Sequence, residues 1–151
     1  MNNLKDITGI LMAIIILSLL QGCGKKSKQL VDYVDPMIGT SDSRWMLYPG
    51  PSLPFGMVKL SPDNQGEMWK AGYEYTIEQI TGFSHLHSWT MGGLLTMPIR
   101  GGLRTQPGSL EGEPESGYNS RFRHEDESAS PGYYKVDLYD YDITAELTAT
   151  T

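Results

Sequence analysis

The sequence predicts an all-β domain built as a β-sandwich. Two observations carry this prediction: short runs in which apolar and polar residues alternate, and turns rich in glycine and proline between such runs. A third is that we find no internal repeat and no long helical period. Residues 31–151 are therefore expected to form one sandwich domain.

In chain order, the first predicted strand is GMVKL at 56–60, after the turn-rich YPGPSLPFG. A turn-like polar stretch at 62–66 then leads to two further strands, AGYEYT and ITGFSHLHSW. A fourth strand, LLTMPI, covers 94–99. The stretch 100–117 has no periodicity and is rich in Gly, Pro and Glu, so it is predicted to be an exposed loop.

The clearest strand pair lies in YYKVDLYDYDITAELTATT. Apolar residues alternate with polar ones first at Tyr134, Val136 and Leu138, then at Ile143, Ala145 and Leu147. Alternation with a period of two gives each strand one buried and one solvated face, and YDYD between them suits a hairpin turn. No turn or charged tail follows the second strand, so we expect that the chain is cut short at Thr151.

The N-terminus predicts a lipoprotein signal peptide over residues 1–22. Its apolar stretch, 10–20, is shorter than the about 20 residues that span a bilayer, and it follows the basic residue Lys5. It ends in Leu-Gln-Gly-Cys, which resembles a bacterial lipobox and predicts lipidation of Cys23, the single cysteine. The alternative is a buried or reactive free thiol. Residues 23–30 are polar and basic, and are expected to be a tether.

Composition and charge exclude some function classes. The formal net charge of −6 argues against nucleic acid as a partner, because nucleic-acid binding needs clustered Lys and Arg. A single cysteine forms no internal disulfide. The predicted location is the bacterial outer membrane or cell envelope, lipid-anchored, on either the periplasmic or the surface face.

The stretch GFSHLHSWT admits three interpretations: a metal site, a sugar-binding edge or a polar strand. His85 and His87 are two residues apart and would point the same way on a strand. The only other histidine is His124, which is too few ligands for a closed zinc site, so no metal site is predicted.

Carboxylates are the other candidates for chemistry. The acidic run that contains Glu125, Asp126 and Glu127 is interpreted as a surface turn rather than as a catalytic pair, because no apolar pocket signature accompanies it. Glu74 lies between aromatic residues on a predicted strand, where it either contacts a sugar hydroxyl or faces solvent.

Several blocks in this order carry a family resemblance: VDPMIGT, YPGPSLPFGMVKLSPDN, AGYEY, GFSHLHSWT, LLTMP and SRFRHEDESASPGYYKVDLYDYDITAELTATT. The series, from Val31 to Thr151, resembles the start of glycoside hydrolase family 92, the calcium-dependent exo-α-mannosidases. The resemblance implies an N-terminal β-sandwich followed by a helical (α/α)6-barrel domain. It also implies release of terminal α-linked mannose with inversion of configuration.

The resemblance also implies where the chemistry lies. The catalytic acid, the water-activating base and most calcium ligands belong to the helical domain, which is absent from this sequence. No catalytic residue and no cofactor are therefore expected in the chain itself, whereas a calcium ion is expected in the full-length enzyme. The implied partners are a mannose-containing glycan, the missing helical domain, and the membrane through the lipid anchor.

Candidate substrate-binding residues follow from the same comparison. Trp69 precedes AGYEY, where similar family members place a tryptophan on the leaving-group side of the pocket; core packing is the alternative. His85 and His87 match a block beside the domain junction, and Trp89 follows them. The run SWTMGGLL departs from the Leu-Ser-Gly-Thr-Gly of many α-1,2-specific members, as does DSRWMLYPGPS from its commoner form, so the linkage stays open.

The sequence thus predicts the N-terminal carbohydrate-binding or scaffold portion of an exo-acting, inverting α-mannosidase, inactive alone. A non-catalytic glycan-binding lipoprotein is the alternative from another class. A sandwich that acts only as scaffold and interaction surface is a third.

Overall fold

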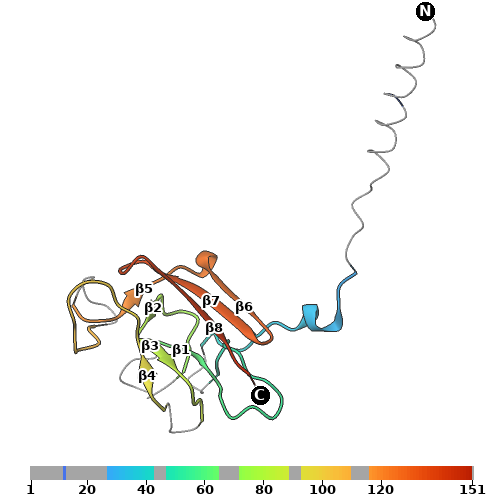
Figure 1. The fold of residues 1–151 in the computed structure, drawn as a ribbon, viewed down its shortest axis with the longest axis horizontal. Helices are drawn as coiled ribbons and strands as arrows, with labels where there is room; N and C mark the ends of the chain where they lie inside the picture. The colour runs from blue at the N-terminus through green and yellow to red at the C-terminus, as the bar shows by residue number, and fades with distance from the viewer. Residues whose placement is uncertain are drawn as a thin grey trace, which may run out of the picture.

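The computed structural model describes residues 12, 27–42, 47–64, 72–88, 93–109 and 116–150. The regular elements among these residues are short strands and two single-turn 3-10 helices, joined by loops and turns (Figure 1). The helices are η1 (Leu30–Tyr33) and η3 (His124–Asp126). The strands are β1 (Ser61–Asp63), β2 (Gln79–Ile80), β3 (Gly82–Ser84), β4 (Leu95–Thr96), β5 (Ser120–Arg121), β6 (Glu127–Ser130), β7 (Tyr133–Leu138) and β8 (Ile143–Thr148).

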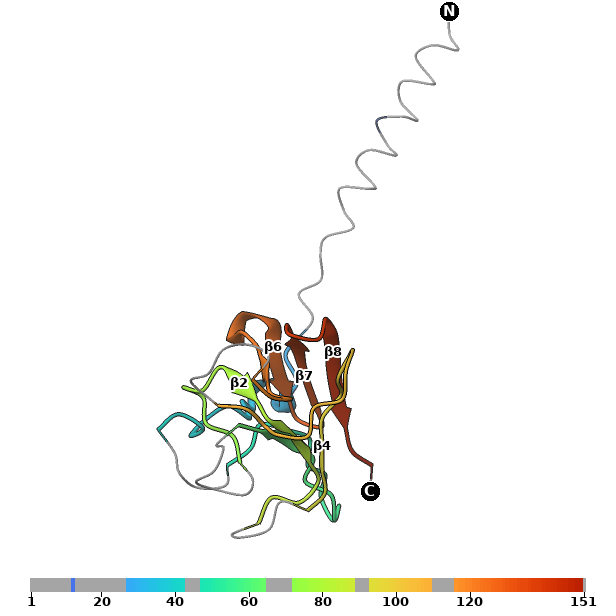
Figure 2. The same ribbon diagram turned by 90° about the vertical axis from the view of Figure 1, so that its left-hand side faces the viewer.

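The strands form three antiparallel sheets, which confirms the predicted all-β class. The orders are β1-β3-β4, β2-β5 and β6-β7-β8. In two perpendicular views the β6-β7-β8 sheet lies against the body formed by the other strands (Figures 1 and 2). This is the two-layer packing expected of a sandwich.

The β7–β8 hairpin forms as its alternation predicts. Tyr134, Val136 and Leu138 are fully buried on β7, and Val136 pairs with Ala145 across the strands. The turn between the strands includes Asp142, whose φ of 53° is one that Asp adopts more readily than most residues. Cross-strand apolar pairs on one face are the main source of stability in such a hairpin.

The hairpin turn is tied to β5 by an ion pair. The Asp140 carboxylate accepts hydrogen bonds from the Arg121 backbone N–H at 2.8 Å and from its Nε at 3.0 Å. Burial alone would raise the pKa of Asp140, but the hydrogen bonds from Arg121 outweigh it, so the pKa lies below the usual 3.8.

The core lies between the β6-β7-β8 sheet and the remaining strands. Apolar residues of β2, β3, β7 and β8 meet there with Tyr73 and Phe122 from loops. Met37, from the segment before β1, packs against the edge of this core. The buried members are Tyr73, Ile80, Phe83, Phe122, Tyr134, Val136, Leu138 and Ala145.

Two predicted strands are wrong. Residues 56–60 belong to a loop that makes a single bridge, between Ser52 and Lys59, because the turn at Leu53–Gly56 bends the backbone away from a ladder. In AGYEYT the described residues also form a turn, with Ile77 N–H bonded to the Glu74 carbonyl. The strand predicted over ITGFSHLHSW is divided, with Thr81 lying between β2 and β3.

Two polar stretches are more ordered than predicted. The stretch 62–66, expected to be a turn, begins with Pro62 and Asp63 of the fully buried strand β1. The acidic run, expected to be a surface turn, starts as η3 but continues into β6 at Glu127, whose side chain is only 3% exposed. Non-local partners bury these polar groups, and local composition does not show them.

The remaining sequence predictions concern the fourth strand, the loop at 100–117 and the N-terminus. The fourth strand is present but short, as β4. Most described residues of 100–117 are solvent-exposed, as predicted. Residues 23–26 of the predicted tether, Cys23 among them, and the predicted signal peptide apart from Met12 lie outside the described residues, whereas the last tether residue, Leu30, begins η1. Within the part of the chain that the structure describes, no helix has the length and apolar character to traverse a bilayer.

Candidate functional site

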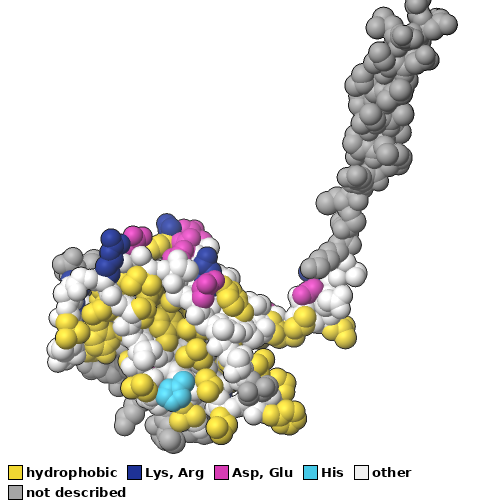
Figure 3. All heavy atoms as spheres, in the orientation of Figure 1, with side chains coloured by type: hydrophobic (Ala, Val, Ile, Leu, Met, Phe, Trp, Pro, Cys, Tyr) yellow, Lys and Arg dark blue, Asp and Glu magenta, His cyan; other side chains and the backbone are white. Residues whose placement is uncertain are grey.

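His85 and His87 do not share a face, contrary to the prediction. Strand β3 ends at Ser84, so strand alternation does not continue through the histidines. His85 is exposed, whereas His87 is buried. Figure 3 accordingly shows an exposed histidine among hydrophobic side chains. Gly93 comes close to the His85 ring, since a Cβ there would lie 2.8 Å from Cε1.

His87 is held by protein groups at both ring nitrogens. Nδ1 lies 2.7 Å from the Lys59 carbonyl oxygen, and Nε2 lies 2.9 Å from Asp63 Oδ1. The ring also packs against Tyr48, with centroids 4.9 Å apart. Because a carbonyl only accepts, Nδ1 carries a proton, and the contact at Nε2 requires a second proton on the ring or on Asp63. The pair is therefore a buried imidazole–carboxylate contact.

Asp63 extends this contact to a second segment. Its Oδ1 also accepts the Gly72 N–H at 2.6 Å, while Oδ2 is buried without a hydrogen-bond partner among the described residues. The Asn64 N–H bonds the Gly72 carbonyl at 3.0 Å. Residues 65–71 connect Asn64 to Gly72, so the His87–Asp63 pair lies at the base of the segment that contains Trp69.

The same pair borders the second tryptophan segment. Trp89 follows His87 by two residues, and both Trp69 and Trp89 lie outside the described residues. Their predicted contacts with substrate, and those of His85 and His87, stay predictions. The geometry adds that the His87–Asp63 contact lies within two residues of the described residues Asn64 and Ser88, which precede residues 65–71 and 89–92.

Glu74 lies in a loop rather than on the predicted strand, and its side chain links this loop to a second one. Its Oε1 accepts hydrogen bonds from the Asp42 N–H at 2.9 Å and from the Thr76 N–H and hydroxyl, both at 3.2 Å. The Asn64 side chain fixes the same loop, bonding the Glu74 N–H at 2.7 Å and the Ile77 carbonyl at 3.0 Å. Its predicted contact with a sugar hydroxyl also stays a prediction.

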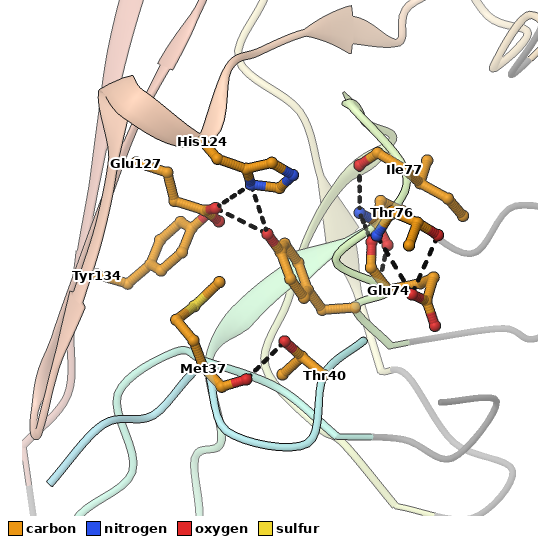
Figure 4. A network of polar contacts seen from close by, with 10 residues as sticks. Met37, Thr40, Glu74, Thr76, Ile77, His124, Glu127 and Tyr134 are labelled. Carbon is orange, nitrogen blue, oxygen red and sulfur yellow. Dashed lines mark hydrogen bonds and ion pairs between the residues drawn. The ribbon is translucent and has the colours of Figure 1, made fainter. Parts of the chain in front are cut away.

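A second buried network surrounds Glu127 (Figure 4). One carboxylate oxygen accepts from the Tyr73 hydroxyl at 2.7 Å and lies 2.9 Å from His124 Nδ1, and the other accepts from the Tyr134 hydroxyl. Burial raises the pKa of both Tyr73 and Tyr134, and the negative charge of Glu127 raises each further. The tyrosines therefore stay protonated donors, and Glu127 joins the hairpin sheet to the loop before β2.

His124 presents an aromatic surface beside this network. Its ring stacks on Tyr75 with centroids 3.9 Å apart and an interplanar angle of 11°. The Phe122 ring meets His124 edge-on at 5.1 Å. Tyr75 is 38% exposed, so this stacked pair reaches the surface.

The structure shows which residues sequence reasoning missed. Asp63, Asn64, Tyr73 and Tyr134 organise the two networks, and none was a candidate. For Asp63 and Asn64, the one feature in the sequence that could have drawn attention to them is the run Ser-Pro-Asp-Asn directly ahead of the segment that contains Trp69. Among the described residues, no three His, Cys, Asp or Glu side chains converge as metal ligands.

Comparison with known proteins gives the same family that the sequence resembles. Residues 33–151 match the model for the glycosyl hydrolase family 92 N-terminal domain. A solved family GH92 alpha-mannosidase from Bacteroides thetaiotaomicron superposes with a TM-score of 0.72 at 38% identity, covering 83% of this chain and 18% of that one. A GH92 inverting mannosidase from the same organism gives 0.62 at 29% identity, with coverage of 83% and 17%.

A curated relative agrees. An uncharacterized secreted glycosidase of Arthroderma benhamiae is 32% identical over 127 residues, which cover 78% of this chain and 16% of that protein. This chain thus spans less than a fifth of the length of each relative. The family model covers most of the chain, and the solved relatives share its sandwich: the chain belongs to glycosyl hydrolase family 92, to which it contributes the N-terminal domain.

Proposed function

We propose that the chain is the glycan-facing N-terminal domain of an exo-acting, inverting α-mannosidase that trims terminal mannose from glycans. The observation that carries this proposal is the likeness to the solved GH92 alpha-mannosidase, at 38% identity and a TM-score of 0.72. Within that enzyme the domain would be a scaffold whose tryptophan segments contact the leaving sugar.

Three largely buried carboxylates support a scaffold role. An inverting glycosidase needs an acid and a base about 6.5–9.5 Å apart, with room for water between them. Asp63, Glu127 and Asp140 each bind donors of the protein itself, at His87, at two tyrosines and at Arg121. We therefore assign the acid and the base to a second, helical domain, and expect this chain alone to be inactive.

Calcium is assigned to the same second domain. Calcium takes six to eight oxygen ligands, and the described residues bring no three acidic side chains together. The described part of this chain does not fit such an ion, and no step of its proposed function depends on one.

We further propose that the protein is attached to the bacterial cell envelope through a lipid on Cys23. The support is the apolar stretch that ends in Leu-Gln-Gly-Cys, together with the secreted nature of the Arthroderma relative. Radiolabelled fatty acid should enter the expressed chain, and Cys23→Ala should abolish the labelling. Equal labelling of the variant would contradict the anchor.

Domain exchange tests the main proposal. Residues 31–151 would replace the matching segment of the Bacteroides alpha-mannosidase, and mannose release from an α-linked mannobiose would be measured. The exchanged enzyme should release mannose, whereas the relative without its N-terminal segment and this chain alone should not. Mannose release by the chain alone, or a folded but inactive exchange protein, would overturn the proposal.

Site variants in the exchanged enzyme test the glycan contact. Trp69→Ala, which removes a proposed contact, and His87→Ala, which removes the support of the neighbouring segments, should reduce turnover of the mannobiose more than that of an aryl mannoside, which lacks the leaving sugar. Equal losses on both substrates would contradict a leaving-group role.

One observation favours a second function, a non-catalytic glycan-binding lipoprotein. The stacked Tyr75–His124 pair presents an exposed aromatic edge, and aromatic rings bind the C–H faces of sugars. Titration of the chain with mannose oligosaccharides, compared between wild type and Tyr75→Ala, separates the two. Saturable binding that is lost in the variant, without activity in the exchanged enzyme, would favour this second function.

A further inference from the structure

The segment that precedes the sandwich displays apolar side chains to solvent. Helix η1 buries none of its residues, and Leu30, Tyr33 and Ile38 are 89%, 69% and 76% exposed. Val31 and Val34 are also exposed. Tyrosine and aliphatic residues so placed leave the segment with an apolar surface that nothing else in the described chain covers.

This display is ordered by the segment's own hydrogen bonds. The Asp32 carboxylate accepts the Gln29 N–H at 2.7 Å, and the Asp35 carboxylate accepts the Met37 N–H at 2.9 Å. Met37 packs against the core and fixes the segment to the body. The two acidic groups are thus engaged in local turns while the apolar side chains point outward.

A second apolar element protrudes on the same side. The turn Leu53–Gly56, closed by a 3.0 Å bond from the Gly56 N–H to the Leu53 carbonyl, leaves Phe55 fully exposed with φ at 65°. Met57 is also largely exposed. In Figure 1 this loop and helix η1 both lie on the right-hand side of the body, where Figure 3 shows hydrophobic side chains at the surface.

A bulky residue at positive φ is an unfavourable way to build a turn. Such strain persists where the surrounding structure enforces it, and it is concentrated at functional sites. The Leu53 side chain lies beside Gly132 in the β6–β7 turn, since a Cβ added to this glycine would be 3.7 Å from Leu53 Cδ2. The fold thereby holds Phe55 out from the body.

The reach of the chain indicates what this side faces. Leu30 is seven positions after Cys23, so the two can be at most about 25 Å apart. Lys25, Lys26 and Lys28 lie between them, and Lys28 Nζ lies 5.3 Å from the centre of the Tyr33 ring. Basic, aromatic and aliphatic residues in this combination are typical of segments that lie at a membrane surface.

We propose that this apolar side rests on the lipid bilayer, with Leu30, Tyr33 and Val34 at the boundary between headgroups and acyl chains and Phe55 as a second contact. This inference depends on the proposed anchor at Cys23, which holds the side within reach of the membrane. Because Asp32 and Asp35 offset two of the three lysines, binding requires no anionic lipid.

Photolabelling of the full lipid-anchored chain tests this. The protein is reconstituted in phosphatidylcholine vesicles that contain a phospholipid with a diazirine in its acyl chain, then irradiated, digested with trypsin and mapped by mass spectrometry. Trypsin releases residues 29–44 and 45–59 as separate peptides, and residues 105–121 as a control from elsewhere. The first two should carry the label, equally with and without added phosphatidylglycerol.

Variants make the result specific. Leu30→Ser with Val34→Ser should lower the labelling of peptide 29–44 at least tenfold, which corresponds to about 1.4 kcal/mol, because two aliphatic side chains no longer enter the acyl-chain region. Leu103→Ser, at an exposed leucine outside both elements, should leave the labelling of 29–44 and 45–59 unchanged.

The outcomes are separable. Equal labelling of peptide 105–121, or no effect of the serine variants, would overturn the proposal. It would also be overturned if peptide 29–44 were found crosslinked to a second copy or to another protein domain instead of to lipid. Fatty-acid incorporation at Cys23 is measured in parallel. Labelling of 29–44 without that incorporation would refute the anchor alone, whereas incorporation without labelling of 29–44 would refute the membrane contact alone.

Discussion

The β6-β7-β8 sheet and the described residues between 47 and 88 bury their side chains by different means. On β7, alternate residues are buried and apolar, and they pair with apolar residues of β8. On β1 all three residues are buried, and Ser61 and Asp63 are polar. Apolar burial tolerates many neighbours, whereas each polar group needs a partner at a defined position. The stability of the described residues between 47 and 88 should therefore be more sensitive to the loss of a single hydrogen-bonded partner.

The largest effect is expected where the two regions meet. Glu127→Leu would leave the hydroxyls of Tyr73 and Tyr134 and the ring of His124 without their common acceptor. Removing one partner of a buried polar network costs about 3–5 kcal/mol, and urea unfolding followed by circular dichroism would measure it. Glu125→Leu, at an exposed neighbour, should change stability by less than about 0.5 kcal/mol. Equal effects of the two variants would show that the network does not join the sheets.

The His87–Asp63 pair should give the next largest effect. Each of His87→Phe and Asp63→Leu leaves the other group buried without its partner, which costs about 2–4 kcal/mol. The double variant should be more stable than the sum of the two losses predicts, by about 1–3 kcal/mol. A double-mutant cycle in urea measures this coupling. Additive losses would mean that the contact is not the source of either effect.

These two regions also differ in how far the sequence predicted them. The hairpin was predicted correctly because burial on β7 follows residue parity, a local property of Tyr134, Val136 and Leu138. The His87–Asp63 pair was missed because its members are 24 residues apart and meet only through the pairing of β1 with β3. Glu127 was missed because one buried carboxylate in an acidic run looks like its exposed neighbours. Family resemblance predicted the sandwich but not these partners.

The ion pair at the hairpin turn should show a pH dependence. Because Arg121 lowers the pKa of Asp140 in the folded chain, the pair stabilises the fold above the unfolded pKa near 3.8, and this stability is lost as the pH falls through the lower, folded value. Asp140→Asn should cost about 1 kcal/mol at neutral pH. The difference between wild type and variant should shrink below pH 3.8 in urea titrations at several pH values. A constant difference would contradict the assignment.

The smallest predicted effect concerns the turn that contains Phe55, compared with the hairpin turn that contains Asp142. Among the described residues, Asp42, Phe55 and Asp142 have positive φ without being glycine, and only Phe55 is bulky. Asp142 suits the hairpin turn, whereas Phe55 does not suit the turn at Leu53–Gly56. Replacing a residue at positive φ by glycine removes about 1–2 kcal/mol of backbone strain from the folded state. The greater flexibility of glycine in the unfolded chain offsets about 0.5–1 kcal/mol of this gain.

Phe55→Gly should therefore be more stable than Phe55→Ala by about 0.5–1 kcal/mol, since both remove the ring and only glycine removes the strain. Thermal unfolding of the two variants side by side measures the difference, and equal midpoints would show that the turn carries no strain. Both variants should lose the photolabel on residues 45–59 to the same extent, because that contact depends on the ring. A more stable variant with a weaker membrane contact would mean that the fold retains an unfavourable turn in order to present Phe55.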